Sequence, residues 1–345
     1  MSDEALLAIE DLHVHFRTRR SLAKAVDGVS LEVRRGEAVC IVGESGCGKT
    51  VTALAVMGLV PQPPGELAGG RILFAGKEIS RLSDREMERY RGRRIAMVFQ
   101  EPLTSLNPVF TIGAQIKEAI SVHEALEPDE LRRRTLKLLS DIGLPSSESR
   151  YRDYPHQLSG GQRQRVMIAM ALACDPDLII ADEPTTALDV TIQAQILNLL
   201  NTIQSGRRKA LLYITHDLGV VANIADRVYV MYSGVIVEQG TTDQIFSDPG
   251  HPYTRGLLAS LPVRARRGKR LHSIAGTVPD PARKPSGCPF HPRCPSALAS
   301  CSEVFPRMCD IGGGHFSRCP VLFEEKSTRR TLKDTPAVPA NLPAG

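Results

Sequence analysis

Residues 43–50, with the sequence GESGCGKT, constrain the fold of this chain more than any other stretch. An apolar, strand-like run at residues 38–42 leads into the segment, and an apolar, helix-like run at residues 51–59 follows it. The G-x-x-x-x-G-K-[ST] spacing between a strand and a helix is typical of a phosphate-binding loop. Backbone N–H groups of small residues can close around phosphate oxygens there, at the positive end of the helix. An ordinary tight turn is the alternative interpretation.

Every residue of this loop is a candidate nucleotide ligand. Lys49 is expected to reach the outer phosphates, and Thr50 is expected to bind Mg²⁺. The full set of candidates is Gly43, Glu44, Ser45, Gly46, Cys47, Gly48, Lys49 and Thr50.

Two adjacent carboxylates, Asp182 and Glu183, end the apolar run that begins at residue 178. Ionised carboxylates at the end of a buried strand are costly unless they bind a cation or accept hydrogen bonds. We therefore expect Asp182 to hold Mg²⁺ and Glu183 to orient or deprotonate the water that attacks the γ-phosphate. A structural ion pair is the alternative.

A histidine and a glycine pair supply two further candidates. His216 follows a buried-strand run at residues 210–215 and is either structural or a γ-phosphate contact. Residues 158–162, LSGGQ, precede a helix pattern at residues 163–174; Ser159 is a natural N-cap, and the glycines let a ligand approach the backbone. This segment is either a second anion-binding helix start or only a cap.

Composition narrows the class of protein. The chain has 345 residues, 42% of them apolar, and a net charge of 43 − 38 = +5. It has no Trp and 5% aromatic residues, so a nucleic-acid-binding stripe of basic and aromatic residues is disfavoured. Residues 1–10 lack a secretory signal pattern, and the longest apolar runs fall short of the roughly 20 residues that span a bilayer. We expect a cytosolic chain that meets a membrane only through partners.

The rest of the pattern is that of an α/β domain with a helical insertion. Phe16 ends the first strand candidate and either packs in the sheet or stacks on a purine base. Strand candidates lie at residues 6–16, 29–33, 71–74, 95–99, 227–231 and 235–238, the last two as a hairpin, and helical patterns lie at residues 83–90 and 112–144.

Together these segments resemble the ATP-binding cassette (ABC) ATPases over about residues 5–265. The resemblance implies a P-loop NTPase fold, with a RecA-like core, an N-terminal antiparallel β subdomain and a helical signature subdomain at about residues 101–175. It implies that ATP and Mg²⁺ bind, with Gln100 as the glutamine-loop residue near Mg²⁺ and His216 as the switch histidine. It further implies that Phe16 stacks on adenine, that residues 187–189 form the D-loop ending at Asp189, and that the signature is formed by Ser159, Gly160, Gly161 and Gln162.

A narrower resemblance is carried by residues 99–108, FQEPLTSLNP, by residues 154–157, YPHQ, and by residues 251–254, HPYT. These segments are similar to the oligopeptide, dipeptide and nickel importer branch. The resemblance implies an ATPase on the cytoplasmic face of the cell membrane. It would power two transmembrane permease subunits that are fed by an extracytoplasmic substrate-binding protein, and the helical insertion would contact a permease. A nickel or other small-solute importer, a non-transport regulatory cassette and an exporter are the alternatives.

One phosphate loop and one signature in a chain without internal repeats imply a dimer, since in this family each ATP lies between the loop of one subunit and the signature of another. The second subunit is either a paralogue or another copy of this chain. Cys47 stands where the branch often has Ser.

Cysteine is concentrated after residue 261, where the composition shifts to Pro, Gly, Arg and Cys. The spacing is not that of a zinc finger. Residues 287–295 resemble the C-terminal motif of the same importer branch, which implies a [4Fe–4S] cluster held by Cys288, Cys294, Cys301 and Cys319, with Cys309 as an extra thiol. Zinc and unligated thiols are the alternatives. We thus predict an ATPase domain at residues 1–260, a cysteine-rich module at 261–326 and a disordered tail at 327–345.

Overall fold

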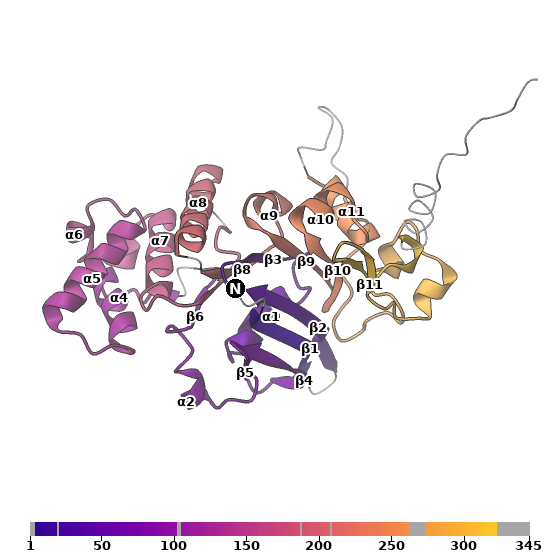
Figure 1. The fold of residues 1–345 in the computed structure, drawn as a ribbon, viewed down its shortest axis with the longest axis horizontal. Coiled ribbons are helices and arrows are strands. Elements are labelled where there is room, and N and C mark those ends of the chain that lie inside the picture. The colour runs from indigo at the N-terminus through magenta and orange to yellow at the C-terminus, as the bar shows by residue number, and fades with distance from the viewer. Residues whose placement is uncertain are drawn as a thin grey trace, which may run out of the picture. The chain divides into compact units, whose positions relative to one another are not determined.

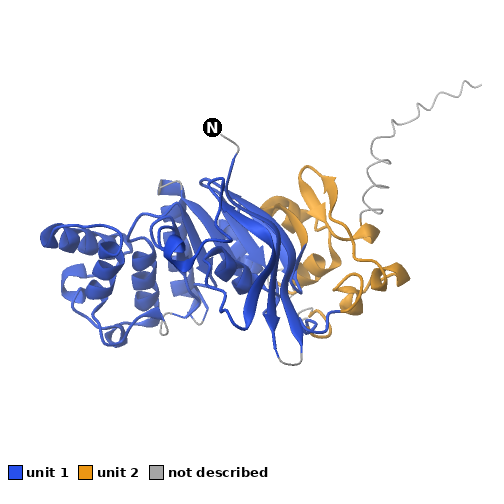
Figure 2. Cartoon of the chain, turned by 90° about the horizontal axis from the view of Figure 1, so that it is seen from below, with its two compact units in different colours: residues 1–236, 278–284 blue, residues 237–277, 285–345 orange. Residues whose placement is uncertain are grey.

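The computed structural model describes residues 4–18, 21–101, 105–186, 188–207, 209–261 and 273–322. The chain forms two compact units (Figure 2). The first contains residues 1–236 with 278–284, and the second contains residues 237–277 with 285–345. The tail predicted to be disordered lies outside the described residues.

A parallel sheet forms the centre of the first unit, with the strand order β9-β3-β8-β7-β6. These strands are short apolar runs in which nearly every residue is buried, as expected for a sheet that is covered on both faces. Val42 pairs with Thr215, and Asp182 pairs with Ile214, so three strands end at one edge. The bounds are β3 (Ala38–Val42), β6 (Ile95–Val98), β7 (Leu178–Asp182), β8 (Ala210–Thr215) and β9 (Arg227–Tyr232).

An antiparallel sheet of order β2-β1-β4-β5 accompanies it in the same unit (Figure 1). Alternating residues of β1, such as Leu12 and Val14, are fully buried, which is the pattern of a strand with one face on a core. The predicted strands here are confirmed in place, although β2 and β4 are longer than their apolar patterns. The bounds are β1 (Ala5–Arg17), β2 (Leu22–Arg34), β4 (Gly65–Phe74) and β5 (Lys77–Glu78).

The helical insertion contains two amphipathic helices and the signature helix, with α4 packed on α5 and α7 (Figure 1). Ile116 and Ile120 of α4 and Leu138 and Leu139 of α5 are buried at helical spacing, so the predicted 3.6-residue pattern is the one that forms the core. The helices of this unit are α1 (Lys49–Val56), α2 (Asp84–Met87), α4 (Ile112–Ser121), α5 (Pro128–Asp141), α6 (Ser147–Arg150), α7 (Gly160–Ala171), α8 (Val190–Arg207) and α9 (Leu218–Ile224). None of the described helices is long and apolar enough to cross a membrane.

The second unit begins within β10 (Val235–Thr241), at residue 237, rather than at residue 261 where the composition changes. The reason is a core that joins both stretches: the buried carboxylate of Glu238 lies 2.7 Å from His315 Nε2, and the ring of Phe290 packs on those of His251 and Tyr253. Its other elements are α10 (Thr242–Ser247), α11 (Pro252–Ala259), two short 3₁₀ turns (His291–Arg293 and Ala299–Ser302), β11 (Cys309–Gly312) and β12 (His315–Ser317).

Candidate functional site

The loop at residues 43–48 connects the buried strand β3 to helix α1 and needs glycine at two positions. A Cβ on Gly43 would lie 2.1 Å from the carbonyl oxygen of Met231, and one on Gly48 would lie 2.4 Å from that of Ala25. Gly48 also has a φ of 106°, which L side chains rarely adopt. The loop backbone therefore carries no side chain at these two positions, which lets it approach a phosphate closely.

Lys49, the first residue of α1, is 4% exposed and points back into the loop. Its Nζ donates to the carbonyl oxygens of Gly43 at 2.7 Å and Glu44 at 3.0 Å. It also lies 4.0 Å from Glu183 Oε1. The ammonium is thus already held beside the loop and the end of β7.

Thr50 and Asp182 meet as the sequence predicts for a Mg²⁺ site. Thr50 Oγ1 donates to Asp182 Oδ1 at 3.1 Å, and the Asp182 side chain is buried at the end of β7. Burial raises the pKa of Asp182, although the hydrogen bond from Thr50 opposes this effect. A buried carboxylate with one hydroxyl partner is a donor set that suits a hard divalent cation such as Mg²⁺.

Glu183 is the centre of the polar contacts at this edge. Its Oε1 lies 3.0 Å from His216 Nδ1, and its Oε2 accepts hydrogen bonds from Gln100 Nε2 at 3.3 Å and from Thr186 Oγ1 at 3.0 Å. The Glu183 backbone has a φ of 43°, an uncommon conformation for a residue with a side chain. Three separate segments therefore orient one carboxylate.

A cavity of about 290 Å³ lies over the phosphate loop. Its lining includes Gln100 and Glu183, so the structure brings the predicted glutamine and glutamate into the same space as the loop. The full lining is Ala25, Ser45, Gly46, Gly48, Lys49, Thr50, Val51, Gln100 and Glu183.

Sequence reasoning missed Ala25, Val51 and Thr186 as parts of this site. Ala25 reaches the cavity from β2 of the antiparallel sheet, and no motif marks an alanine for that role. Val51 follows the motif on α1, and Thr186 supports Glu183 through its hydroxyl. The spacing from Glu183 to Thr186 could have indicated the hydroxyl, because a turn after a strand brings residues three apart into contact.

Phe16 is not among the residues that line this cavity. It is half-buried near the end of β1, paired with Ala23 on one side and Gly65 on the other. The adenine contact therefore stays a prediction.

The signature segment is a well-capped helix start that is also absent from the cavity lining. Ser159 Oγ accepts from Gln162 N, and Gln162 Oε1 accepts from Ser159 N at 3.0 Å, which forms a capping box. A Cβ on Gly161 would lie 2.5 Å from Ile192 Cγ2, and Gly160 lies near Leu188. The signature residues therefore do not complete the phosphate site of their own chain.

The end of the D-loop caps α8: Asp189 Oδ1 accepts a hydrogen bond from Ile192 N at 2.9 Å. Ala187, the first residue of that loop, lies outside the described residues.

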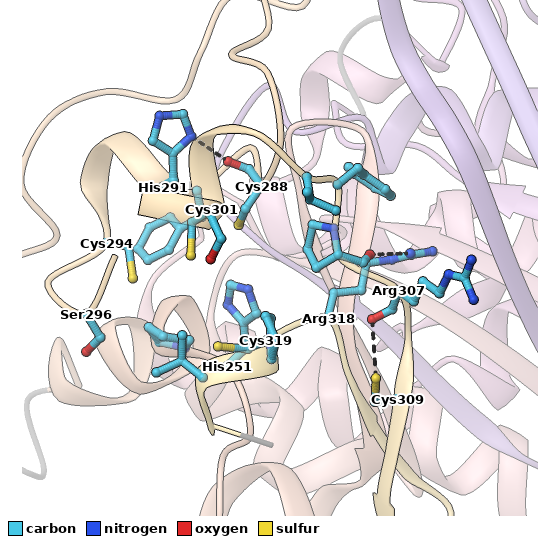
Figure 3. A pocket seen from close by; sticks show the side chains of 18 residues that line it. His251, Cys288, His291, Cys294, Ser296, Cys301, Arg307, Cys309, Arg318 and Cys319 are labelled. Atoms are coloured by element: carbon cyan, nitrogen blue, oxygen red, sulfur yellow. Dashed lines mark hydrogen bonds between the residues drawn. The ribbon is translucent and has the colours of Figure 1, made fainter. Parts of the chain in front are cut away.

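A second candidate site is a cavity of about 450 Å³ within the second unit. Figure 3 shows four thiols, those of Cys288, Cys294, Cys301 and Cys319, around one space, with His251 beside Cys319. Cys309 also lines this cavity but lies apart from the four, and its thiol faces the carbonyl oxygen of Arg307 at 3.7 Å. The geometry thus separates the four predicted ligands from the fifth thiol.

Burial favours the thiol form of three of these cysteines. It raises the pKa of Cys288 and Cys294, and it raises that of Cys319 to about 11. A bound metal favours the thiolate over the thiol. Among the described residues, no three cysteine sulfurs lie within 4.8 Å of one another.

Two family profiles match this chain. One, described as ABC transporter, matches residues 26–186, and the other, described as oligopeptide/dipeptide transporter, C-terminal region, matches residues 237–301. The first covers the phosphate loop, the glutamine, the signature and the paired acids, and the second reaches Cys301.

Curated relatives are similar over nearly the whole chain. The dipeptide transport ATP-binding protein DppD of Bacillus subtilis (strain 168) is 49% identical over 316 residues, which is 92% of this chain and 94% of the relative. The oligopeptide transport ATP-binding protein OppD of the same organism is 49% identical over 312 residues, 90% of this chain and 87% of the relative.

Solved structures match the first part of the chain. A dimeric post-hydrolysis state of the ATP-binding cassette MJ0796, bound to ADP and Pi, aligns with a TM-score of 0.62 at 28% identity, covering 68% of this chain and 98% of that one. CbiO1 of Clostridium perfringens, part of the transporter complex CbiONQ, aligns with a TM-score of 0.61 at 29% identity, covering 71% and 92%. These matches bear out the predicted P-loop NTPase fold.

Proposed function

We propose, from the premise that this chain belongs to the ATP-binding cassette transporter ATPases, that it hydrolyses ATP to power the uptake of di- or oligopeptides through partner permeases. Membership rests on the relatives described above, which are dipeptide and oligopeptide transport ATP-binding proteins. The observation that carries the ATPase activity is the meeting of Lys49, Gln100 and Glu183 around one cavity over the phosphate loop, with His216 in contact with Glu183.

The residues in and around the cavity have separate roles in ATP hydrolysis. The backbone N–H groups of the loop and the Lys49 ammonium would bind the phosphates of ATP. Thr50, Asp182 and Gln100 would hold Mg²⁺, which when bound neutralises phosphate charge. Glu183 would orient the attacking water and accept its proton. His216 lies on the other Glu183 oxygen from Gln100, so the carboxylate is fixed from both sides.

We assign the signature residues Ser159, Gly160, Gly161 and Gln162 to ATP held by a facing subunit. The support is that they stand outside the cavity of their own chain, at the N-terminus of α7, where backbone N–H groups suit an anion. The facing subunit would be either a paralogue or a second copy of this chain, with Asp189 near the contact.

The helical insertion would contact a permease. Val109, Phe110 and Val122 expose 70%, 52% and 70% of their surface there, and exposed apolar surface of this kind suits a contact with a partner protein. A cavity of about 220 Å³ between the end of β6 and α7 is lined mostly by apolar residues, among them the flexible side chains of Met97, Met167 and Met170. Two transmembrane permeases and an extracytoplasmic binding protein complete the importer, which places this subunit at the cytoplasmic face of the membrane.

Peptides are preferred over nickel as the cargo class. Relatives that match 92%, 90% and 94% of this chain are named for dipeptide and oligopeptide transport. A regulatory cassette without a permease is disfavoured by the second matching segment, at residues 237–301, which is described as a transporter region.

The four thiols around the larger cavity would hold a [4Fe–4S] cluster. A tetrahedral zinc site with Zn–S bonds of about 2.3 Å would bring its sulfurs to within roughly 3.8 Å of one another. Among the described residues no three cysteine sulfurs lie within 4.8 Å of one another, so these thiols would have to move to share one zinc ion. When bound, the cluster would supply a one-electron centre and cross-link segments that contain few regular elements.

Transport in proteoliposomes tests the proposed function. The chain is reconstituted with its permeases and partner ATPase, and uptake of a labelled dipeptide is measured with and without ATP and the cognate binding protein. ATP-dependent uptake of the dipeptide, with no uptake of Ni²⁺, is expected. Uptake of Ni²⁺ alone, or ATPase activity that no permease or peptide stimulates, would contradict the assignment.

A further inference from the structure

Two histidines and an aspartate lie together on the antiparallel sheet, and none of the three lines either of the cavities described above. His13 and His15 are two apart on β1, so they stand on one face of the sheet, and Asp27 on β2 is the direct partner of His13 in the ladder. Residues 278–284 run along the free edge of β2, where the carbonyl oxygen of Pro281 accepts a hydrogen bond from the backbone N–H of Lys24.

The three side chains converge as metal ligands would. One ligand atom from each of His13, His15 and Asp27 lies within 4.8 Å of the others, and this is the one such group of three or more among the described residues. His13 Nδ1 is 3.3 Å from Asp27 Oδ1. His15 Nε2 is buried and has no hydrogen-bond partner. A buried imidazole nitrogen without a partner is unfavourable, and a cation would supply the missing contact.

Supporting contacts hold the ligands in place. The other nitrogen of His13, Nε2, lies 3.3 Å from Asp11 Oδ1, which is the carboxylate–histidine arrangement found behind metal-bound imidazoles. Asp27 Oδ2 accepts from Lys284 Nζ at 3.3 Å, so Oδ1 remains on the side of the histidines. Asp11 therefore orients His13, and Lys284 orients Asp27.

The local charge is balanced rather than strongly negative. Lys284 and Lys24 lie 3.3 and 4.0 Å from Asp27 oxygens and oppose a cation, whereas Asp11 and Asp27 favour one. Side-chain exposure of 29% for His13 and 25% for Asp27 leaves room for a water or another outside ligand. Two imidazoles and one carboxylate with an open position suit zinc and related divalent transition metals, and not Mg²⁺ or Ca²⁺.

We propose that His13, His15 and Asp27 bind one divalent transition-metal ion of the Zn²⁺ class. The site would tie β1 to β2 beside the nucleotide-binding elements, since Phe16 follows His15 directly and Ala25 of β2 lines the phosphate cavity. This inference does not depend on peptide transport or on the iron–sulfur assignment.

Cobalt is the probe that separates this site from the cysteine cavity. The full-length protein is titrated with Co²⁺ under anaerobic conditions and followed by visible absorption. Binding to nitrogen and oxygen ligands gives weak ligand-field bands, whereas binding to thiolates adds intense charge-transfer bands near the ultraviolet. We expect one equivalent of Co²⁺ to bind and to give only the weak ligand-field bands. Added Zn²⁺ should displace this Co²⁺ and remove the bands.

Two single variants test the ligands, and a third serves as a control. His13→Gln and His15→Gln should each weaken this Co²⁺ binding by about tenfold or more while leaving ATP binding unchanged. The matched control is His156→Gln, because His156 is an exposed histidine of the same unit that stacks on Tyr154. Equal Co²⁺ affinity in all four proteins, or thiolate bands alone, would overturn the proposal.

Discussion

The phosphate loop of the first unit and the cysteine cavity of the second are built by opposite means. The loop is held between β3 and α1, and its shape comes from backbone positions such as Gly43 and Gly48, where neighbouring carbonyls leave no room for a side chain. The cysteine cavity is lined mainly by side chains from 3₁₀ turns and loops, and the strands nearby, β11 and β12, are only four and three residues long.

This contrast shows how each site depends on its ligand. A strand–loop–helix site keeps its form without a nucleotide, because the sheet supplies its hydrogen bonds. Thiols with raised pKa values and no common ligand must instead be deprotonated and drawn together by a metal centre, so binding and local folding are coupled there. We therefore expect substitutions in the first site to change chemistry and those in the second to change structure.

The largest expected effect follows Glu183→Gln. The glutamine can keep the hydrogen-bonded position but cannot accept a proton, so ATP hydrolysis should fall roughly 10²- to 10⁴-fold while ATP binding persists. Phosphate release and nucleotide binding measure the two parts. Glu148→Gln, at an exposed glutamate of α6, is the control. Near-normal turnover of the Glu183 variant would remove the role assigned to that residue.

The next effect concerns the cysteines. Cys294→Ser should lose nearly all bound iron and lower the unfolding temperature, because one of four thiolate ligands is missing. Cys309→Ser is the matched control, since this thiol lies apart from the others and should leave the iron content unchanged. Iron and sulfide analysis after anaerobic purification measures both. Equal iron loss in the two variants, or zinc in place of iron, would contradict the cluster assignment.

A pair of glycine variants measures how rigid the loop is. Gly46 and Gly48 have φ values of 79° and 106°, so alanine at either position is strained, by about 1–2 kcal/mol. A Cβ at Gly46 meets nothing within 4 Å, whereas one at Gly48 lies 2.4 Å from Ala25 O. Gly48→Ala should therefore cost at least about 1 kcal/mol more free energy of unfolding than Gly46→Ala. Equal losses in urea unfolding would mean that the loop adapts.

A smaller effect is expected in the pH dependence of stability. Burial raises the pKa of Asp182 above its usual 3.8, so this group stabilises the fold at low pH and loses that contribution as pH rises through its folded pKa. In EDTA, Asp182→Asn should lack this loss and become more stable than the wild type as pH rises towards 8. Thermal unfolding from pH 4 to 8 measures the difference. Addition of Mg²⁺ and ATP should stabilise only the wild type. A difference in stability between the two proteins that is the same at every pH would refute the buried charge as the cause.

The smallest effect is expected for Cys47→Ser. Cys47 is 1% exposed, its thiol lies 3.9 Å from Lys49 Nζ, and burial raises its pKa, so it acts as a small neutral side chain. Serine is of similar size, and the free energy of unfolding should change by about 1 kcal/mol or less. Steady-state ATP hydrolysis should be close to that of the wild type. A large loss of hydrolysis would show that the thiol itself is needed.

The sequence predicted the strands and helices of the first unit well, because their apolar periods are local. It was less informative where the fold joins distant segments. The second unit starts within β10 since Glu238 and His315, 77 residues apart, meet in its core, and no change in composition marks that point. Ala25 was missed for the same reason, as it reaches the phosphate cavity from a strand of another sheet.

The sequence alone determined the phosphate loop, the capped start of α7 and the buried strand that ends in two acids, because each depends on residues within a few positions of one another. Tertiary structure decided what these segments meet. Parallel pairing of β7 with β6 and β8 brings Glu183 to Gln100 and His216, and packing of the second unit separates Cys309 from the four other thiols. The physical reason is that backbone geometry is fixed locally, whereas the convergence of side chains depends on strand register and on the packing of distant segments.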